Sequence, residues 1–127
     1  MKVINTEKAP AAIGPYSQAI QMNEILFTSG QIPLNPETGN VEADTIEEQS
    51  RQVMENVGEI LKAAGTSFQN VIKTTCFLAD MEHFAAFNNI YAEYFISKPA
   101  RSCVAVRTLP KNVLCEVEVI AACPKNP

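Results

Sequence analysis

Two alternating stretches near the C-terminus read Pro99-Ala100-Arg101-Ser102-Cys103-Val104-Ala105-Val106 and Cys115-Glu116-Val117-Glu118-Val119-Ile120. Valine recurs at every second position in both, a pattern that is typical of β-strands. The residues between them, Thr108-Leu109-Pro110-Lys111-Asn112, predict a turn. The two stretches are therefore expected to pair as a hairpin.

The same alternation predicts which side chains share a face of this hairpin. In one register Cys103 lies across from Glu116, and Arg101 lies across from Glu118, at about 5 Å. These four side chains would then share one sheet face, where we expect the chemistry. The alternative interpretation is that the charges only solvate an exposed face, which is common in antiparallel sheets.

The rest of the chain predicts two helices and further strands. Thr45 and Glu48 form a capping box, and an apolar stripe follows as far as Gly65. A second helix, striped by aromatic residues, is expected over about 81–96 behind a cap at Asp80. Strands are expected over 16–22, 25–32 and 71–78, with residues 1–15 irregular or at a sheet edge. This order predicts an α+β fold: a mixed β-sheet with two helices packed on one face and the other face uncovered.

Length and composition predict a single domain, residues 1–127, in the cytoplasm. The net charge of −4 argues against a nucleic-acid partner, because affinity for nucleic acids is largely cationic. We expect no membrane span and no signal peptide, because no apolar run is long enough for either. The four cysteines include no C-x-x-C pair, which indicates reduced thiols. The single histidine, His83, argues against a multi-histidine metal site.

Four ordered blocks of the sequence resemble the RidA/YjgF family of imine deaminases. The blocks are Ala9–Ala19 (APAAIGPYSQA), Thr28–Pro33 (TSGQIP), Val71–Thr75 (VIKTT) and Pro99–Ala121, which contains PARSCV, LPK and EVEVIA. The resemblance covers essentially the whole chain. It implies a chorismate mutase-like fold and a homotrimer whose sheets face inward, with sites at the subunit interfaces. An uncovered sheet face that carries Ile120 fits such an assembly, since oligomerisation would bury it.

Arg101 and Glu116 are the candidate catalytic residues. A guanidinium stays protonated and binds carboxylates with two parallel hydrogen bonds, so Arg101 suits the binding of an acid substrate. A partly buried carboxylate can deprotonate water, which suits Glu116. From the residues alone, Arg101 could instead pair with Glu116 or Glu118 as a structural ion pair. The resemblance favours the catalytic roles and leaves Glu118 structural.

Four further residues are candidates for substrate binding. Cys103 is interpreted as pocket lining and a backbone donor, because no histidine lies near it in sequence to activate the thiol. Tyr16 and Asn88 match pocket positions of the family, although a core aromatic and a polar helix residue would look the same. Gly30 lacks a side chain and so allows its backbone to approach a ligand closely, although a glycine near the end of a strand could equally indicate a bulge.

The resemblance therefore implies hydrolysis of reactive enamines and imines, such as 2-aminoacrylate/2-iminopropanoate and 2-iminobutanoate, to 2-keto acids and ammonia. We expect no cofactor and no metal, because an imine is already electrophilic. One alternative is a binding protein or sensor for small keto acids that does not turn them over. Another is a macromolecular role, either as a holdase chaperone or as an RNA-cleaving factor.

Overall fold

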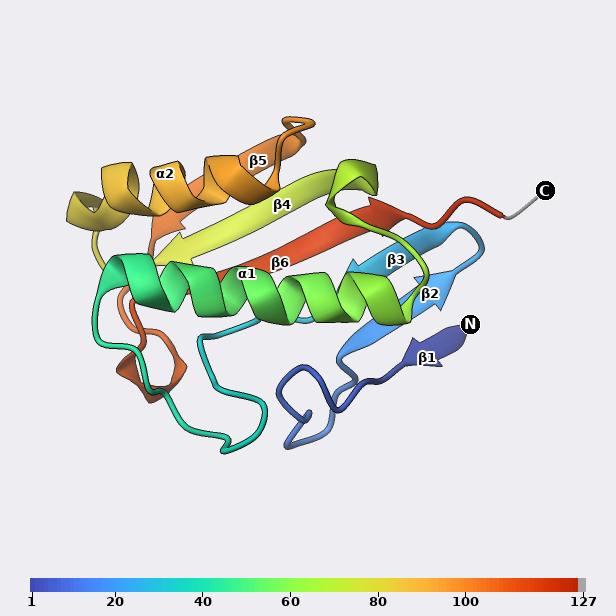
Figure 1. The fold of residues 1–127 in the computed structure, drawn as a ribbon, viewed down its shortest axis with the longest axis horizontal. Coiled ribbons are helices and arrows are strands. Elements are labelled where there is room, and N and C mark those ends of the chain that lie inside the picture. The colour runs from blue at the N-terminus through green and yellow to red at the C-terminus, as the bar shows by residue number, and fades with distance from the viewer. Residues whose placement is uncertain (126–127) are drawn as a thin grey trace.

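A computed structural model describes residues 1–125, which contain six strands and two α-helices (Figure 1). The strands are β1 (Lys2–Ile4), β2 (Ala19–Met22), β3 (Ile25–Thr28), β4 (Val71–Leu78), β5 (Ala100–Ala105) and β6 (Cys115–Ala122). The helices are α1 (Ile46–Ala63) and α2 (Phe84–Tyr94), and short 3₁₀ turns lie at Phe68–Asn70, Met81–His83 and Pro110–Asn112. All six strands join one mixed sheet in the order β1-β2-β3-β6-β4-β5. The predicted α+β class with a mixed sheet is confirmed.

The predicted hairpin between the last two strands is wrong, because β4 lies between them. β4 pairs with β6 in the antiparallel sense over most of its length, and with β5 in the parallel sense. The chain passes from β4 through α2 to β5, and the turn at Pro110–Asn112 then leads it across to β6. Alternation within a strand distinguishes its two faces, but it does not determine which strand is its neighbour.

α1 begins and ends where its sequence predicts. The Thr45 hydroxyl accepts a hydrogen bond from the Glu48 amide at 3.1 Å and donates one to the Glu48 carboxylate at 3.1 Å. Beyond the helix, Gly65 adopts a φ of +78°, the left-handed conformation that ends helices and favours glycine. Between these ends, Val57 and Ile60 lie fully buried against the sheet.

α2 is shorter than the predicted helix over 81–96. Asp80 does act as a cap, since its carboxylate accepts a hydrogen bond from the Glu82 amide at 2.8 Å. The residues that follow first form the 3₁₀ turn Met81–His83, and the α-helix covers only Phe84–Tyr94. Neither helix of the described residues is both long and apolar enough to span a membrane.

Two predicted strands are also shorter in the structure. The strand expected over 16–22 begins at Ala19, directly after Gln18, whose buried side chain ties this end of the strand to the N-terminal segment. That side chain accepts a hydrogen bond from the amide of Thr6 at 2.7 Å and donates to the carbonyl of Pro10 at 2.8 Å. The strand expected over 25–32 ends at Thr28, where the chain turns out of the ladder.

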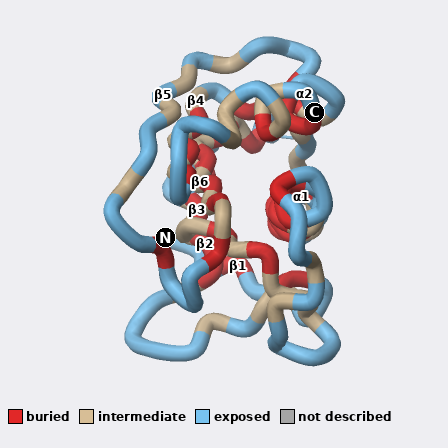
Figure 2. The backbone as a smooth tube through the Cα atoms, turned by 90° about the vertical axis from the view of Figure 1, so that its left-hand side faces the viewer, coloured by how far each residue is buried: buried red, intermediate tan, exposed pale blue. Residues whose placement is uncertain are grey.

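Both helices lie on the same side of the sheet, as predicted (Figure 2). The opposite face carries apolar side chains that the described residues leave exposed: Phe27 and Val104 are each 46% exposed, and Ile120 is half-buried. Phe27 and Ile120 are register partners on β3 and β6, whereas Val104 lies apart from them on β5, where it pairs with Phe77 of β4.

Candidate active site

The candidate residues of β5 and β6 lie on opposite faces of the sheet, and the prediction that they share one face is wrong. Arg101 and Cys103 pair with the buried Thr74 and Cys76 of β4, on the face beneath the helices. Glu116 and Glu118 lie on the opposite face, which neither helix covers and which we call the bare face. Because β4 lies between the two strands, its pairing with each of them decides which of their side chains share a face.

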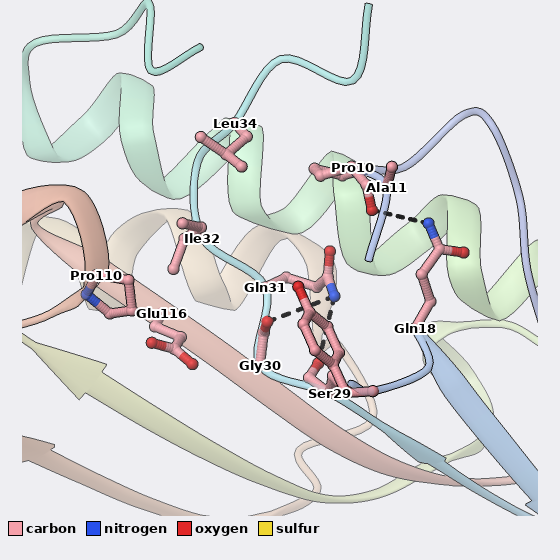
Figure 3. Close-up of a pocket in the computed structure, with 11 residues that line it drawn as sticks. Pro10, Ala11, Gln18, Ser29, Gly30, Gln31, Ile32, Leu34, Pro110 and Glu116 are labelled. Atoms are coloured by element: carbon pink, nitrogen blue, oxygen red, sulfur yellow. Dashed lines mark hydrogen bonds between the residues drawn. The ribbon is translucent and has the colours of Figure 1, made fainter. Parts of the chain in front are cut away.

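On the bare face, Glu116 borders a cavity of about 410 Å³ (Figure 3). Its walls come from the N-terminal segment, the turn after β3 and the turn before β6. The lining residues are Pro10, Ala11, Tyr16, Gln18, Ser29, Gly30, Gln31, Ile32, Leu34, Pro110 and Glu116. The candidates Tyr16, Gly30 and Glu116 are thus brought together here.

Hydrogen bonds hold the segment after β3, which forms one wall of this cavity. The backbone of Gln31 exchanges two hydrogen bonds with that of Val117, at 2.8 and 3.1 Å. The Ser29 hydroxyl donates to the Ser17 carbonyl at 2.6 Å, and the Ser29 amide donates to the Gln18 carbonyl at 2.9 Å. Gly30 is therefore held between two anchored residues, directly beside the Glu116 side chain.

Burial raises the pKa of the Glu116 carboxyl above its ordinary value, and the neighbouring charge of Glu118 raises it further. A raised pKa makes a carboxylate a stronger base towards water at neutral pH. The cavity beside it has room for water and for a small substrate. This corner of the sheet can therefore hold a general base.

Gly30 shows the close approach that its sequence position predicts. A Cβ at this position would overlap the carboxylate of Glu116. We expect Gly30→Ala to fold but to displace that carboxylate, lowering any turnover that depends on it by about 10- to 100-fold, since small misplacements have effects of this size. Gly39→Ala is the control for a destabilising glycine substitution away from the cavity: its φ of +75° strains an alanine, but nothing lies within 4 Å of the added Cβ. Parental turnover in folded Gly30→Ala would show that the Glu116 position is unimportant.

On the opposite face, Arg101 borders a second cavity of about 630 Å³ between β5 and α2. Its lining residues are Asn88, Tyr91, Ala92, Phe95, Ile96, Lys98, Pro99 and Arg101. The guanidinium of Arg101 donates a hydrogen bond to the side-chain oxygen of Asn88 at 2.7 Å. The structure thus brings these two candidates together, with Asn88 bound to the arginine.

Within residues 1–125, the Arg101 guanidinium donates a side-chain hydrogen bond to Asn88 and keeps further N–H donors available. It is half-buried, and within residues 1–125 no carboxylate lies within ion-pair distance of it. The structural ion pair to Glu116 or Glu118, left open by the sequence, is therefore absent from the described residues. A guanidinium has five N–H donors, so a planar carboxylate could bind beside Asn88 with two parallel hydrogen bonds.

Cys103 lies two residues beyond Arg101 on the same face and is half-buried. Burial raises the pKa of its thiol, although the charge of Arg101 acts in the opposite direction. The thiol is therefore protonated at neutral pH, which disfavours it as a nucleophile.

We expect Cys103→Ser to retain most of the parental activity, because the substitution keeps the backbone amide and removes only a protonated thiol. Steady-state kinetics of the two proteins, matched for folding by circular dichroism, check this. Loss of turnover in a folded Cys103→Ser protein would instead identify the thiol as a nucleophile.

Within residues 1–125, no group of three or more histidine, cysteine or acidic side chains is placed to hold a metal ion. His83 lies in the 3₁₀ turn before α2, away from both cavities. The four cysteines are free, as expected for reduced thiols.

A family model described as endoribonuclease L-PSP matches residues 6–123 of the chain. The chain belongs to this family. A RutC family protein of Pyrococcus horikoshii is 55% identical over 94% of this chain and 96% of its own length. A Mus musculus relative, named 2-iminobutanoate/2-iminopropanoate deaminase, is 50% identical over 94% of this chain and 90% of its own length. The crystal structure of E. coli TdcF with bound serine has a TM-score of 0.91 at 45% identity, covering 96% of this chain and 98% of that one.

Membership of the L-PSP family confirms the RidA/YjgF resemblance of the sequence, and the structural match confirms the mixed sheet with two helices. Sequence reasoning missed other residues that shape the two cavities. Gln18 lies inside one of the matching blocks, but its role depends on three backbone carbonyls that only the fold brings near. Phe84 and Tyr91 belong to the aromatic stripe of the helix predicted over 81–96, but such a stripe does not reveal their contact with Arg101.

Proposed function

We propose that this L-PSP family member hydrolyses 2-imino acids formed from reactive enamines, such as 2-aminoacrylate/2-iminopropanoate and 2-iminobutanoate. One water adds across the C=N bond, and the products are a 2-keto acid and ammonia. The observation that carries the proposal is the half-buried guanidinium of Arg101, which has one side-chain hydrogen-bond partner and no carboxylate partner in the described residues. Such a group is suited to the carboxylate that every 2-imino acid carries.

In this mechanism Arg101 binds the substrate carboxylate and Asn88 holds the guanidinium in place. Glu116 takes a proton from water as the oxygen attacks the carbon of the protonated imine, forming a tetrahedral amino alcohol. Glu116 then passes this proton to the nitrogen. As the C–N bond breaks, the hydroxyl of the amino alcohol gives its proton back to Glu116, and the 2-keto acid and ammonia leave. Backbone groups near Cys103 and Gly30, together with the Tyr16 ring, complete the pocket. The imine carbon is already electrophilic, so the reaction requires neither cofactor nor metal.

A site that uses both Arg101 and Glu116 must combine two copies of the chain, since the two side chains lie on opposite faces of one sheet. We propose a homotrimer with a chorismate mutase-like arrangement, in which the bare sheet faces turn inward and each site lies at a subunit interface. The exposed apolar side chains of the bare face, Phe27 and Val104, support this assembly because contact with a second copy would cover them.

We expect the protein to have the mass of a trimer by light scattering after size exclusion at micromolar concentration. A sharper measurement mixes two inactive variants, Arg101→Ala and Glu116→Gln, and allows their subunits to exchange. If each site takes its arginine and its glutamate from different chains, roughly a quarter of the sites become intact on statistical mixing. A monomer mass, or no recovery after demonstrated exchange, would rule out the shared site.

The proposed activity is tested by coupling to a threonine dehydratase that releases the enamine of threonine. With semicarbazide present to trap the imine, this protein should speed the formation of 2-oxobutanoate and ammonia and reduce the yield of the trapped product. Unchanged rates at high protein concentration would exclude the deaminase activity. Binding of 2-oxobutanoate without turnover would identify the alternative, a keto-acid sensor.

The macromolecular alternatives have weaker support. The exposed apolar face could serve a holdase, but self-association would cover the same surface. The net charge of −4 disfavours RNA as a substrate. The partner that the cavities fit best is a small 2-imino or 2-keto carboxylate. A cytoplasmic location is part of the same proposal, supported by the four free cysteines.

A further inference from the structure

The guanidinium of Arg101 lies against aromatic rings of α2. Its central carbon lies 4.6 Å from the centre of the Tyr91 ring and 5.5 Å from that of Phe84. Both distances are within the range in which a cation is attracted to the face of an aromatic ring. Together with the hydrogen bond to Asn88, these contacts surround the cation with groups from three positions of one helix.

Tyr91 is itself held in place from two sides. Its hydroxyl forms a 2.8 Å hydrogen bond with the hydroxyl of Thr74, and its ring stacks on Phe95 with centroids 4.4 Å apart. Tyr91 is 7% exposed and Thr74 is fully buried, so solvent cannot replace this bond easily. Burial also raises the pKa of the Tyr91 hydroxyl, which keeps it neutral.

The hydrogen bond between Tyr91 and Thr74 connects α2 to the strand that pairs with β5. Thr74 is the register partner of Arg101 across the parallel pair β4–β5. The Tyr91 hydroxyl is therefore anchored at the point of the sheet from which the Arg101 side chain starts. If Tyr91 served only to fill the core, phenylalanine would fill the same volume without needing a partner for a buried hydroxyl.

We infer that Tyr91, fixed by Thr74, is a positioning residue that preorganises Arg101 for a substrate carboxylate. This inference rests on the proposed function, because it names what holds the carboxylate-binding group. A free arginine side chain loses much rotational freedom when it binds an anion, and a fixed aromatic surface reduces that loss. Tyr91 lines the same cavity, and its effect on ligand affinity would come through the position of Arg101.

The test measures binding of 2-oxobutanoate by calorimetry to the parent, to Tyr91→Leu and to Tyr91→Phe. Leucine removes the aromatic face, and we expect Kd to rise about 2- to 30-fold, the range of a cation–π contact. KM should rise with Kd while kcat changes less. Tyr91→Phe keeps the face and should recover most of the affinity. Ile60→Ala is the matched control for core truncation. Ile60 belongs to α1 and is fully buried, so its truncation should lower the melting temperature and leave the Kd for 2-oxobutanoate unchanged.

A double-mutant comparison separates positioning from a general structural role. Arg101→Lys keeps a charge, so binding stays measurable, but it lacks the planar guanidinium. Tyr91→Leu should weaken binding less in the Arg101→Lys protein than in the parent. If Tyr91→Leu does not fold, Thr74→Val and Tyr91→Phe replace it: each should raise Kd slightly, and together no more than one alone, because both remove the same hydrogen bond.

Two results would overturn the inference. One is a parental Kd in every folded variant of Tyr91 and Thr74. The other is an equal loss of affinity from Tyr91→Leu in the parent and in Arg101→Lys. Failure of the proposed function looks different: the parent itself would then neither bind 2-oxobutanoate nor release ammonia from the imine.

Discussion

Glu116→Gln is expected to lower turnover by about 10²- to 10⁴-fold, the usual effect of a lost general base, while ligand binding survives. Glutamine has nearly the same shape and still offers an oxygen to hold water, but it cannot accept a proton. The half-buried carboxylate also repels an anionic ligand, so the variant should bind 2-oxobutanoate as well as the parent or slightly better. Semicarbazide-competition kinetics and calorimetry on the same preparations measure the two effects separately.

Glu118→Gln is the matched control for this substitution. Glu118 lies two residues further along β6 on the same face and raises the pKa of Glu116 through its charge. Its removal should leave a working base whose pKa is lower, so the acid limb of the pH–rate profile should move to lower pH. Near-parental turnover in Glu116→Gln would show that this glutamate belongs only to the solvated surface.

The pH dependence of stability provides an independent check on Glu116. Because burial raises its pKa, the folded protein binds this proton more tightly than the unfolded chain. The stability from this group is fully present below the ordinary glutamate pKa of about 4.3, and it is lost as pH rises through the raised value. Glu116→Gln should therefore be more stable than the parent at pH 7 and not at pH 4. A loss of turnover at pH 7 then cannot be attributed to unfolding.

Arg101→Ala should abolish ligand binding and turnover together. Each hydrogen bond to a charged group contributes about 1.5–3 kcal/mol, so removal of a two-bond contact is expected to raise the Kd for 2-oxobutanoate by at least about 10²-fold. Arg101→Lys should be intermediate, because an ammonium keeps the charge but cannot form two parallel bonds. Calorimetry and the coupled assay measure the two quantities.

The control for Arg101 is Arg51→Ala, which removes the other arginine that the structure shows in a side-chain contact. Arg51 pairs with Glu93 at 3.0 Å on the exposed outer surface of the helices, where such pairs contribute little to stability. This variant should bind 2-oxobutanoate like the parent. If Arg101→Ala also binds like the parent, the ligand carboxylate lies elsewhere, and the proposed site is wrong.

The sequence by itself determined the local elements and the kinds of residue in the site. The capping box at Thr45, the stop at Gly65 and the cap at Asp80 act through backbone atoms at most a few positions away, so local order is enough to predict them. The RidA/YjgF resemblance selected Arg101 and Glu116 from among ten basic and fourteen acidic residues. For Gly30 the sequence predicted a close approach or a bulge, and only the structure shows that the close neighbour is the Glu116 carboxylate.

Only the tertiary structure decided which of these residues meet. The period of two gave the correct faces within β5 and within β6, but β4 lies between the two strands and its pairing with each sets their relative orientation. Strand order depends on contacts between residues far apart in sequence, which no local pattern contains. Arg101 and Glu116 lie on opposite faces because β4 lies between β5 and β6 in the sheet. The contact between Arg101 and Tyr91 has the same origin, because pairing with β4 places the β5 arginine beneath α2, where an aromatic stripe becomes part of the proposed binding site.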